Sequence, residues 1–562
     1  MTVPIVAVLI VAVLAVLAIA GATTLGRRWG VATPLLLVAL GIGVSLLPSV
    51  PTVEIEPEWI LAGVLPPLLY SASVSMPGMD FRREFTAIAG LSVALVVLSA
   101  VILGLFFAWL IPDLGLGWGI ALGAIVSPTD AVATSIVKRI GAPPRVVAML
   151  EGESLLNDAT ALVLLRAAIA GAGASVSLWS VVGDFAFAVV IAVVIGLIVG
   201  RLNLLVRARV KDATVNTVIS FTVPFIASVP AELLGASGLV AAVVAGLVTG
   251  RGAIRVLSPQ HRLSDSQNWK TVELLLEGAI FLTMGLELAA IIGDVQEDHA
   301  GIGVAIALAA AALLLTIIVR AAYVAPLLAG LQRNARRRLR RKPRLASMQE
   351  RIENPDAALG GFPGGRTPPQ ARLERISGTL RRMLADIEYF VSQPLGWREG
   401  SIVVWAGMRG AITLAAAQTL PVEAHSRSLL VFIAFLVAAG SLLLQGGTLA
   451  RVYSWVRPAP VDPAVEGLER VRLMALLDRA AEDARAADAG RERNEPGDIR
   501  WPGEESKRLS LAIIVAQRTA LLKARDDGAF SAGALGAALA VLDADQLSLE
   551  LKGAPTDLDG EA

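Results

Sequence analysis

The sequence predicts an all-α polytopic membrane protein with about 13 transmembrane helices. Apolar residues make up 55% of the 562 residues, charged residues only 17%, and the mean hydropathy is +0.67. This is too apolar for a soluble chain of such length. Stretches of about 20 apolar residues, enough to cross ~30 Å of hydrocarbon, follow one another from residue 3 to residue 453. Basic residues alternate between the connections, as in a chain threaded through a bilayer.

The apolar stretches define thirteen predicted spans, several of which are short for a perpendicular crossing. They cover residues 3–21, 34–48, 58–73, 86–110, 116–137, 146–170, 177–201, 214–230, 236–250, 271–291, 301–330, 398–420 and 428–453. We expect the seventh span to link two sets of six helices. An odd number of crossings puts the two ends of the chain on opposite sides of the membrane.

Lys and Arg collect in alternate connections. The odd-numbered connections contain Arg27 and Arg28, Arg82 and Arg83, Lys138, Arg139 and Arg145, Arg207, Arg209 and Lys211, and Arg251, Arg255, Arg262 and Lys270. The even-numbered connections contain none except Arg427. We therefore expect a cell (plasma) membrane protein with its N-terminus outside and its C-terminus in the cytoplasm. A cleaved signal peptide is the alternative for the first span, but no basic segment precedes it.

Two parts of the chain depart from this pattern. We expect a transmembrane domain over residues 1–457, containing a cytoplasmic linker at 331–397, and a cytoplasmic helical tail over 458–562. The linker begins very basic, at Arg333 to Arg344, and this half either lies against anionic headgroups or is a solvated marker of orientation. Polar helices are expected in the tail at 464–492, 505–527 and 531–551, as a regulatory or assembly segment.

Composition also narrows the chemistry. Cysteine is absent and there are only three histidines, so we expect no disulfide, no cofactor and no histidine-rich metal site. A formal net charge of +1 gives no global excess that would indicate a nucleic-acid partner. The sequence has no Walker-type glycine loop, so transport would have to run on an ion gradient. We expect a transporter and not an enzyme.

Charge inside the fifth span indicates a functional site. Ser127-Pro128-Thr129-Asp130 interrupts an apolar run, and an ionisable group near mid-membrane costs at least ~2.5–3.5 kcal/mol. Pro128 removes a backbone donor, so the helix should break and free carbonyl oxygens that can bind a cation. Asp130 would add a carboxylate and Thr129 a hydroxyl. The alternative, a proline kink capped by Asp130, leaves the charge at membrane depth unexplained.

The sixth span adds a second group of carboxylates. Asp158 lies near its midpoint, and Ser154, one turn earlier, shares its face. Glu153 lies five residues before Asp158 and points about 140° away from it. It needs a cation from another helix, and Arg409, flanked by glycines near the middle of the twelfth span, is the expected partner. We expect this pair to hold helices together and not to carry the transported ion.

The two interrupted spans occupy corresponding places in the two sets of six helices. The break at Asp130 lies in the fifth helix of the first set, and the region of Arg409 lies in the fifth helix of the second set, with opposite orientation. Discontinuous helices at matching positions of inverted repeats point to a transporter site. Glu277, inward of the middle of the tenth span, either packs between helices or lines a cytoplasmic ion funnel.

Three motifs resemble, in order and spacing, the monovalent cation:proton antiporter-1 family of NhaP- and NHE-type exchangers. They are Ser127-Pro-Thr-Asp130, Glu151-Gly-Glu-Ser-Leu-Leu-Asn-Asp158 and Gly407-Met-Arg-Gly410, and the resemblance covers residues 1 to about 455. It implies that Asp158 alternately holds a cation or a proton. It further implies that Thr129, Asp130 and Ser154 complete the oxygen ligands of Na+, and that Asn157 orients the site.

The same resemblance implies three further properties. Glu153 and Arg409 would form a stabilising pair, the protein would be a homodimer, and Asn157, where electrogenic relatives carry Asp, predicts exchange of one cation for one proton. One position departs from the family. Ser71 follows Tyr70 of the third span where some members have an acidic residue, which puts an acidic ligand from that span in doubt.

The expected function is exchange of Na+, with Li+ or K+ as alternatives, for H+, serving pH and sodium homeostasis. Either ion would neutralise one shared carboxylate and let the core helices move, whereas an empty charged site would stay in place. A K+/H+ antiporter of the same fold is the nearest alternative. An intramembrane aspartyl protease using Asp130 and Asp158, or a gated cation channel, would also place carboxylates in the membrane. The ligand-like Ser, Thr and Asn beside each Asp disfavour the protease, and flux stoichiometry would distinguish the channel.

Overall fold

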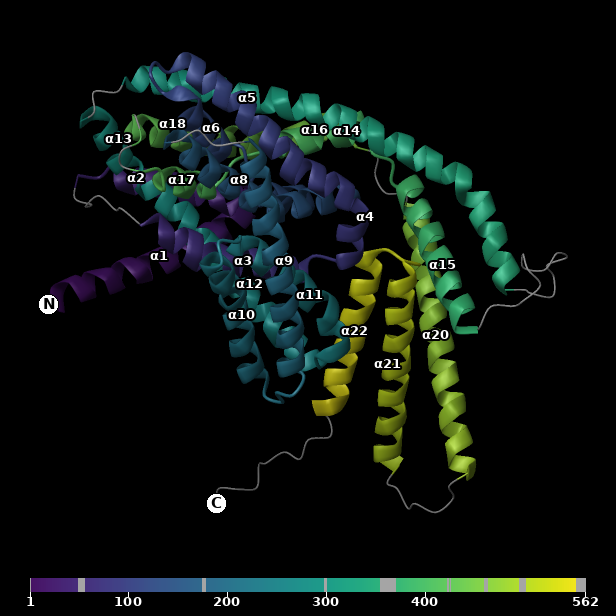
Figure 1. The fold of residues 1–562 in the computed structure, drawn as a ribbon. Coiled ribbons are helices and arrows are strands. Elements are labelled where there is room, and N and C mark those ends of the chain that lie inside the picture. The colour runs from purple at the N-terminus through teal and green to yellow at the C-terminus, as the bar shows by residue number, and fades with distance from the viewer. Residues whose placement is uncertain are drawn as a thin grey trace, which may run out of the picture. The chain divides into compact units, whose positions relative to one another are not determined.

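The fold is that of a helical membrane protein (Figure 1). The computed structural model describes residues 2–48, 56–173, 178–297, 301–353, 370–421, 424, 426–458, 463–494 and 502–551. Within these ranges all regular secondary structure is helical. The chain divides into two compact units, the first formed by residues 1–257, 261–329 and 395–459 and the second by residues 258–260, 330–394 and 460–562. The predicted all-α class is confirmed.

Every predicted span coincides with helical structure in the first unit. The helices are α1 (Thr2–Trp29), α2 (Thr33–Ser45), η1 (Trp59–Val64), α3 (Leu65–Ser75), α4 (Gly78–Ala89), η2 (Gly90–Ala94), α5 (Leu95–Leu110), α6 (Gly115–Val126), α7 (Val132–Arg139), α8 (Pro144–Gly173), α9 (Leu178–Arg207), α10 (Ala213–Leu233), α11 (Gly238–Val256), α12 (Pro259–Leu286), α13 (Leu288–Glu297), α14 (Ile302–Glu353), α16 (Trp397–Trp405), α17 (Ala411–Gln418), α18 (Arg427–Ser441), η4 (Leu442–Gly446) and α19 (Gly447–Val456).

Length and hydropathy by themselves support nine of the thirteen predicted membrane crossings. In the described part of the chain, ten helices are long and apolar enough to span a bilayer, and one of them, Ala532–Leu551, belongs to the tail. Shorter apolar helices at Thr33–Ser45, Trp59–Ser75 and Gly115–Val126 account for three more predicted spans. The remaining predicted span is split between α16 and α17, each too short to cross alone.

The fifth and twelfth spans are both interrupted, as predicted. Residues 127–131 separate α6 from α7, and residues 406–410 separate α16 from α17. Proline at position 128 and glycines at 407 and 410 are the local causes, because proline removes a backbone donor and glycine permits close backbone approach. Each break therefore leaves backbone groups that must find partners elsewhere.

Helices of the first unit pack in two groups. In one, α3, α9, α10 and α11 surround a cluster rich in alanine and valine. In the other, α5 and α8 pack with α6, α4 packs with α8, and α17 and α18 contact α6 as well. Gly123 of α6 lies so close to α5 that a Cβ there would overlap the Ala100 carbonyl oxygen. Helix α8 belongs to the second group and also contacts α3 and α11, so its residues lie where the groups meet.

The second unit contains the predicted helices of the tail. These are α20 (Pro463–Asn494), α21 (Pro502–Asp527) and α22 (Ala532–Leu551), and α21 contacts both of the others. Leu477, Leu521 and Leu539 are among their buried side chains. Helix α15 (Gln370–Ser392), from the linker, packs on α21. The proline- and glycine-rich stretch of the linker lies outside the described residues.

Candidate functional site

The first break is held by Asp130. Its backbone N–H donates to the carbonyl oxygen of Met408 at 2.8 Å, which joins the two interrupted helices directly. Its carboxylate oxygen Oδ1 accepts from the backbone N–H of Val132 at 3.0 Å, at the first residue of α7. Side-chain oxygens in this position satisfy donors that a helix start leaves unpaired. One oxygen of Asp130 is thus used structurally.

The second break is held by Arg409. This side chain is 2% exposed, and its Nε donates to the carbonyl oxygen of Val126 at 2.9 Å, at the last residue of α6. A second guanidinium nitrogen donates to the carbonyl oxygen of Gly407. The backbone N–H of Arg409 donates to the hydroxyl of Ser441 on α18 at 2.8 Å. Arg409 therefore supplies donors to carbonyls freed by both breaks.

Glu153 is paired with Arg320 and not with Arg409. Nη2 of Arg320 donates to Oε2 of Glu153 at 2.7 Å, and Nη1 donates to Oε1, so the two groups are joined fork to fork. Arg320 also donates from Nε to the Val403 carbonyl oxygen at 2.9 Å. The predicted Glu153–Arg409 pair is wrong. The planar guanidinium of Arg320 matches a carboxylate bidentately, whereas the donors of Arg409 are used by backbone carbonyls.

Sequence reasoning missed Arg320, although a signal was present. It lies within the predicted span 301–330 as an isolated arginine in an apolar run, the same kind of signal that singled out Arg409. In the structure it is 2% exposed on α14. An arginine in that position must find an anion or carbonyl oxygens, and Arg320 finds the Glu153 carboxylate and the Val403 carbonyl oxygen.

Thr129 connects the break to the ion pair and to Asn157. Its hydroxyl donates to Oε1 of Glu153 at 2.9 Å. The side-chain amide of Asn157 donates to the carbonyl oxygen of Thr129 at 2.8 Å and to its hydroxyl at 2.9 Å. Asn157 is completely buried, and its amide oxygen has no partner among the described residues. These bonds fix where the backbone of the break lies relative to α8.

Asp158 and Ser154 lie one turn apart on α8, and both are buried. The Ser154 hydroxyl donates back to the carbonyl oxygen of Glu151 at 3.0 Å, which leaves its lone pairs available. Within the described ranges, no hydrogen bond or ion pair engages the carboxylate of Asp158. Asp158 and Asp130 repel each other electrostatically. A cation or a proton at Asp158 would relieve that repulsion.

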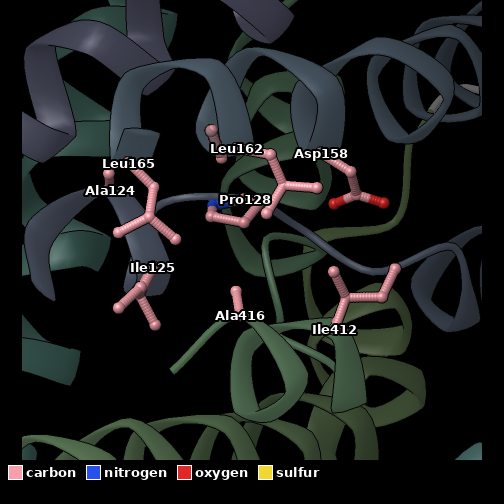
Figure 2. Close-up of a pocket in the computed structure, with 9 residues that line it drawn as sticks. Ala124, Ile125, Pro128, Asp158, Leu162, Leu165, Ile412 and Ala416 are labelled. Carbon is pink, nitrogen blue, oxygen red and sulfur yellow. The ribbon is translucent and has the colours of Figure 1, made fainter. Parts of the chain in front are cut away.

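The Asp158 carboxylate borders a small cavity (Figure 2). Its volume is about 10 Å³, close to the space that one water molecule requires. The other lining residues are apolar and come from α6, the break after it, α8 and α17: Ala124, Ile125, Pro128, Ala161, Leu162, Leu165, Ile412 and Ala416. Asp158 is thus the one ionisable residue among those lining this cavity.

Carboxylates of α12 lie near the site. Glu277 is half-buried and interacts electrostatically with Asp130 and with Glu273, one turn earlier on α12. Glu273, which sequence reasoning did not single out, interacts with the hydroxyl of Ser71 on α3. An acidic residue from another helix therefore lies beside the serine that departs from the family pattern. The i, i+4 spacing of Glu273 and Glu277 was the available signal.

Arg427, the exception to the positive-inside pattern, has a structural explanation. Its Nε donates to the carbonyl oxygen of Leu420 at 2.9 Å, and Nη2 donates to that of Gln418 at 3.0 Å. Gln418 is the last residue of α17 and Leu420 follows it by two positions, at a helix end where carbonyls lack partners. A cation there also complements the negative end of the helix. This arginine therefore holds the end of the short helix that follows the second break.

Comparison with known proteins decides the family. The profile described as "Sodium/hydrogen exchanger, transmembrane" matches residues 12–350. The chain belongs to this family. It is 30% identical over 467 residues to an uncharacterized Na+/H+ exchanger of Mycobacterium tuberculosis, covering 81% of this chain and 76% of the other. It is also 30% identical over 276 residues to a sodium, potassium, lithium and rubidium/H+ antiporter of Bacillus subtilis, covering 48% of this chain and 41% of that one.

Comparison with solved structures supports the fold. The sodium proton antiporter MjNhaP1 from Methanocaldococcus jannaschii matches with a TM-score of 0.54, over 80% of this chain and 99% of that chain. Sequence identity in this comparison is 14%, so the likeness concerns the fold. The family resemblance inferred from the three motifs is confirmed.

Proposed function

We propose that this antiporter exchanges one monovalent cation for one proton at Asp158. The observation that carries the proposal is the setting of that carboxylate. It is buried, unpaired among the described residues, and beside two interrupted helices that hold each other through Asp130 and Met408. A carboxylate desolvated in this way must be neutralised, and a cation and a proton would compete for it.

The proposed cation site combines Asp158 with oxygens already oriented by the fold. Ser154 shares the face of α8 with Asp158, and its hydroxyl oxygen has free lone pairs. Asp130 would contribute the oxygen that does not cap α7. Thr129 would contribute through the remaining lone pairs of its carbonyl and hydroxyl oxygens. Hydroxyl, carbonyl and carboxylate oxygens suit hard cations such as Na+, Li+ and K+.

Other residues would position this site. Asn157 holds the Thr129 backbone, and the Glu153–Arg320 pair holds the Thr129 hydroxyl, so both act on the same segment. Arg409 would keep the two breaks together through its bonds to backbone carbonyls. Glu277, with Glu273, would attract cations from the cytoplasmic side. These roles separate the groups that bind the ion from the groups that hold them in place.

The proposed motion follows from where α8 lies. It packs in one group of helices and contacts α3 and α11 of the other. An empty, charged Asp158 cannot be moved across an apolar contact surface without a large desolvation cost, whereas a neutralised one can. Movement with either a cation or a proton bound, but not with the site empty, produces exchange. One carboxylate binding one ion at a time corresponds to a 1:1 ratio.

The names of the relatives provide candidates for the transported cation. The Mycobacterium tuberculosis relative is named a Na+/H+ exchanger, and the Bacillus subtilis relative is named for sodium, potassium, lithium and rubidium. We propose Na+ with Li+ as the principal substrates, with K+ exchange as the alternative. The physiological roles would be pH and sodium homeostasis in the cell membrane, with the N-terminus outside and the C-terminus in the cytoplasm. A homodimer is part of the same proposal.

Transport in proteoliposomes tests the role of Asp158. With a pH-sensitive dye, addition of Na+, Li+ or K+ in turn to the wild-type protein should identify the cations that drive proton movement. Asp158→Asn should abolish this movement because a neutral amide cannot exchange a proton for a cation. Asp184→Asn, which removes an exposed carboxylate on α9, should leave it unchanged. Thermal unfolding should show that both variants remain folded.

The outcomes distinguish the alternatives. Retained exchange in folded Asp158→Asn would contradict the assignment of this residue as the ion carrier. Passage of Na+ without proton counter-transport would contradict antiport and indicate a channel. Movement of net charge in each cycle, measured as a response to membrane potential, would contradict the 1:1 ratio while leaving the site intact.

We infer a transmembrane antiporter domain over residues 1–457 and a cytoplasmic tail over residues 458–562. Support comes from the compact unit that the tail helices form, with buried leucines such as Leu477 and Leu539. The linker, residues 331–397, falls mainly in that same unit.

A further inference from the structure

Helix α14 continues far beyond its apolar part. It runs without interruption from Ile302 to Glu353, and the segment after Leu331 is dominated by cations. These are Arg333, Arg336, Arg337, Arg338, Arg340, Arg341, Lys342 and Arg344. The first of them lies two residues beyond Leu331, so the basic segment starts where the apolar segment stops.

One face of this basic segment is covered by α15. Arg338 lies over the ring of Phe390, with its guanidinium carbon 5.1 Å from the ring centre, and Lys342 is 3.0 Å from the carboxylate of Glu388. Half-buried Leu331, Ala335, Leu345 and Gln349 have the spacing of that same helical face.

The opposite face of the basic segment presents four arginines. Arg333, Arg337, Arg340 and Arg344 follow each other at intervals of four, three and four residues, which places them within about 60° of one another around the helix. All four are exposed. Among the described residues, no carboxylate forms an ion pair with any of them. We call these four residues the arginine face of α14.

We propose that the arginine face of α14 binds the headgroups of anionic phospholipids in the cytoplasmic leaflet. A guanidinium offers a planar fork that fits phosphate oxygens, and the helix that carries it is continuous with an apolar span. Long arginine side chains can reach back toward the interface, and the field of an anionic surface extends over a Debye length of about 8 Å. If these cations served only to set the orientation of the chain in the membrane, they would not need to be gathered on one face of the helix.

Lipid binding would bear on the ion site through the same helix. Arg320, which forms the fork with Glu153, lies thirteen residues before Arg333 on α14, or about 20 Å along the axis. A headgroup bound at the arginine face would therefore help to set the axial position of α14. This consequence rests on the proposed function, whereas lipid binding itself does not.

Native mass spectrometry of the purified full-length protein tests the binding directly. After addition of phosphatidylglycerol or phosphatidylcholine, the wild-type protein should retain phosphatidylglycerol preferentially, on the order of tenfold. Replacing the arginine face by glutamine (Arg333, Arg337, Arg340 and Arg344→Gln) should remove most of this preference. A matched control removes four exposed arginines of α20 (Arg470, Arg472, Arg479 and Arg485→Gln) and should keep it.

Two further measurements keep the test decisive. On the wild-type protein alone, the preference for phosphatidylglycerol should fall as salt is raised, because exposed charges are screened. Equal retention of phosphatidylglycerol by the wild-type protein and the glutamine variant would overturn the proposal. Displacement of bound phosphatidylglycerol by a short RNA, at concentrations where inorganic phosphate has no effect, would overturn it in favour of a nucleic-acid surface. Neither readout involves transport, so failure here is distinct from failure of the antiport proposal.

Discussion

At the scale of single residues, the site separates binding from support. Asp158 has no partner among the described residues. The carboxylate of Glu153 accepts three hydrogen bonds, two from guanidinium nitrogens of Arg320 and one from the hydroxyl of Thr129. A carboxylate that is fully hydrogen-bonded has little capacity left for a transported ion. The unpaired carboxylate of Asp158, five residues later on α8, retains its full capacity to bind an ion.

The Glu153–Arg320 pair provides a prediction at this scale. Arg320→Met should destabilise the protein by ~3–5 kcal/mol, because it leaves a buried carboxylate without its cation. The matched control is Arg166→Met, whose pair with Glu232 is largely exposed at 3.0 Å and should contribute ~0–1 kcal/mol. Chemical or thermal unfolding in detergent would measure both. Similar losses of stability in the two variants would show that the buried pair contributes no more than the exposed pair.

At the scale of helices, the two breaks form one unit. The backbone N–H of Asp130 in the first break donates to the carbonyl oxygen of Met408 in the second. The side chain of Arg409 in the second break donates to the carbonyl oxygen of Val126, just before the first. Each interruption thus supplies what the other lacks, because the donors and acceptors freed by one helix end are satisfied at the other. Crossed half-helices of this kind place their ends at the carboxylates of the site.

Close approach of the breaks can be tested at Gly410. Its φ of −120° suits any residue, but a Cβ there would overlap the carboxylate of Asp130. Gly410→Ala should therefore displace Asp130, lower stability by ~1–3 kcal/mol and reduce cation affinity in exchange assays. Gly447→Ala, where a Cβ would meet nothing within 4 Å, is the control and should behave as wild type. An unchanged KM for Na+ in Gly410→Ala would argue against Asp130 as a ligand.

At the scale of the whole molecule, charge placement predicts orientation. The chain has no cysteine, so a single introduced thiol reports on its own position. We expect a membrane-impermeant maleimide to label Gln296→Cys in intact cells, because this residue lies in an even-numbered connection. Arg209→Cys, in an odd-numbered connection, should be labelled only after permeabilisation. Both positions are exposed. The reverse pattern would invert the proposed topology.

Much of the fold could be predicted from local sequence. Hydropathy located the helices that coincide with the predicted spans, because burial in lipid is required of each span separately. Proline at position 128 and glycines around position 409 located both breaks, since each acts on its own backbone. The i, i+4 relation placed Ser154 beside Asp158 because both belong to one helix. These predictions needed no knowledge of how the helices pack.

Only the tertiary structure decided which partners meet. Glu153 had two buried arginines available, and Arg320, on a helix 167 residues away in sequence, is the one that reaches it. Arg409 lies instead at the two breaks, where unpaired carbonyls compete successfully for its donors. Hydropathy and spacing describe one helix at a time. A pairing between helices depends on distances that packing alone sets, because a buried charge takes the geometrically best partner among all those within reach.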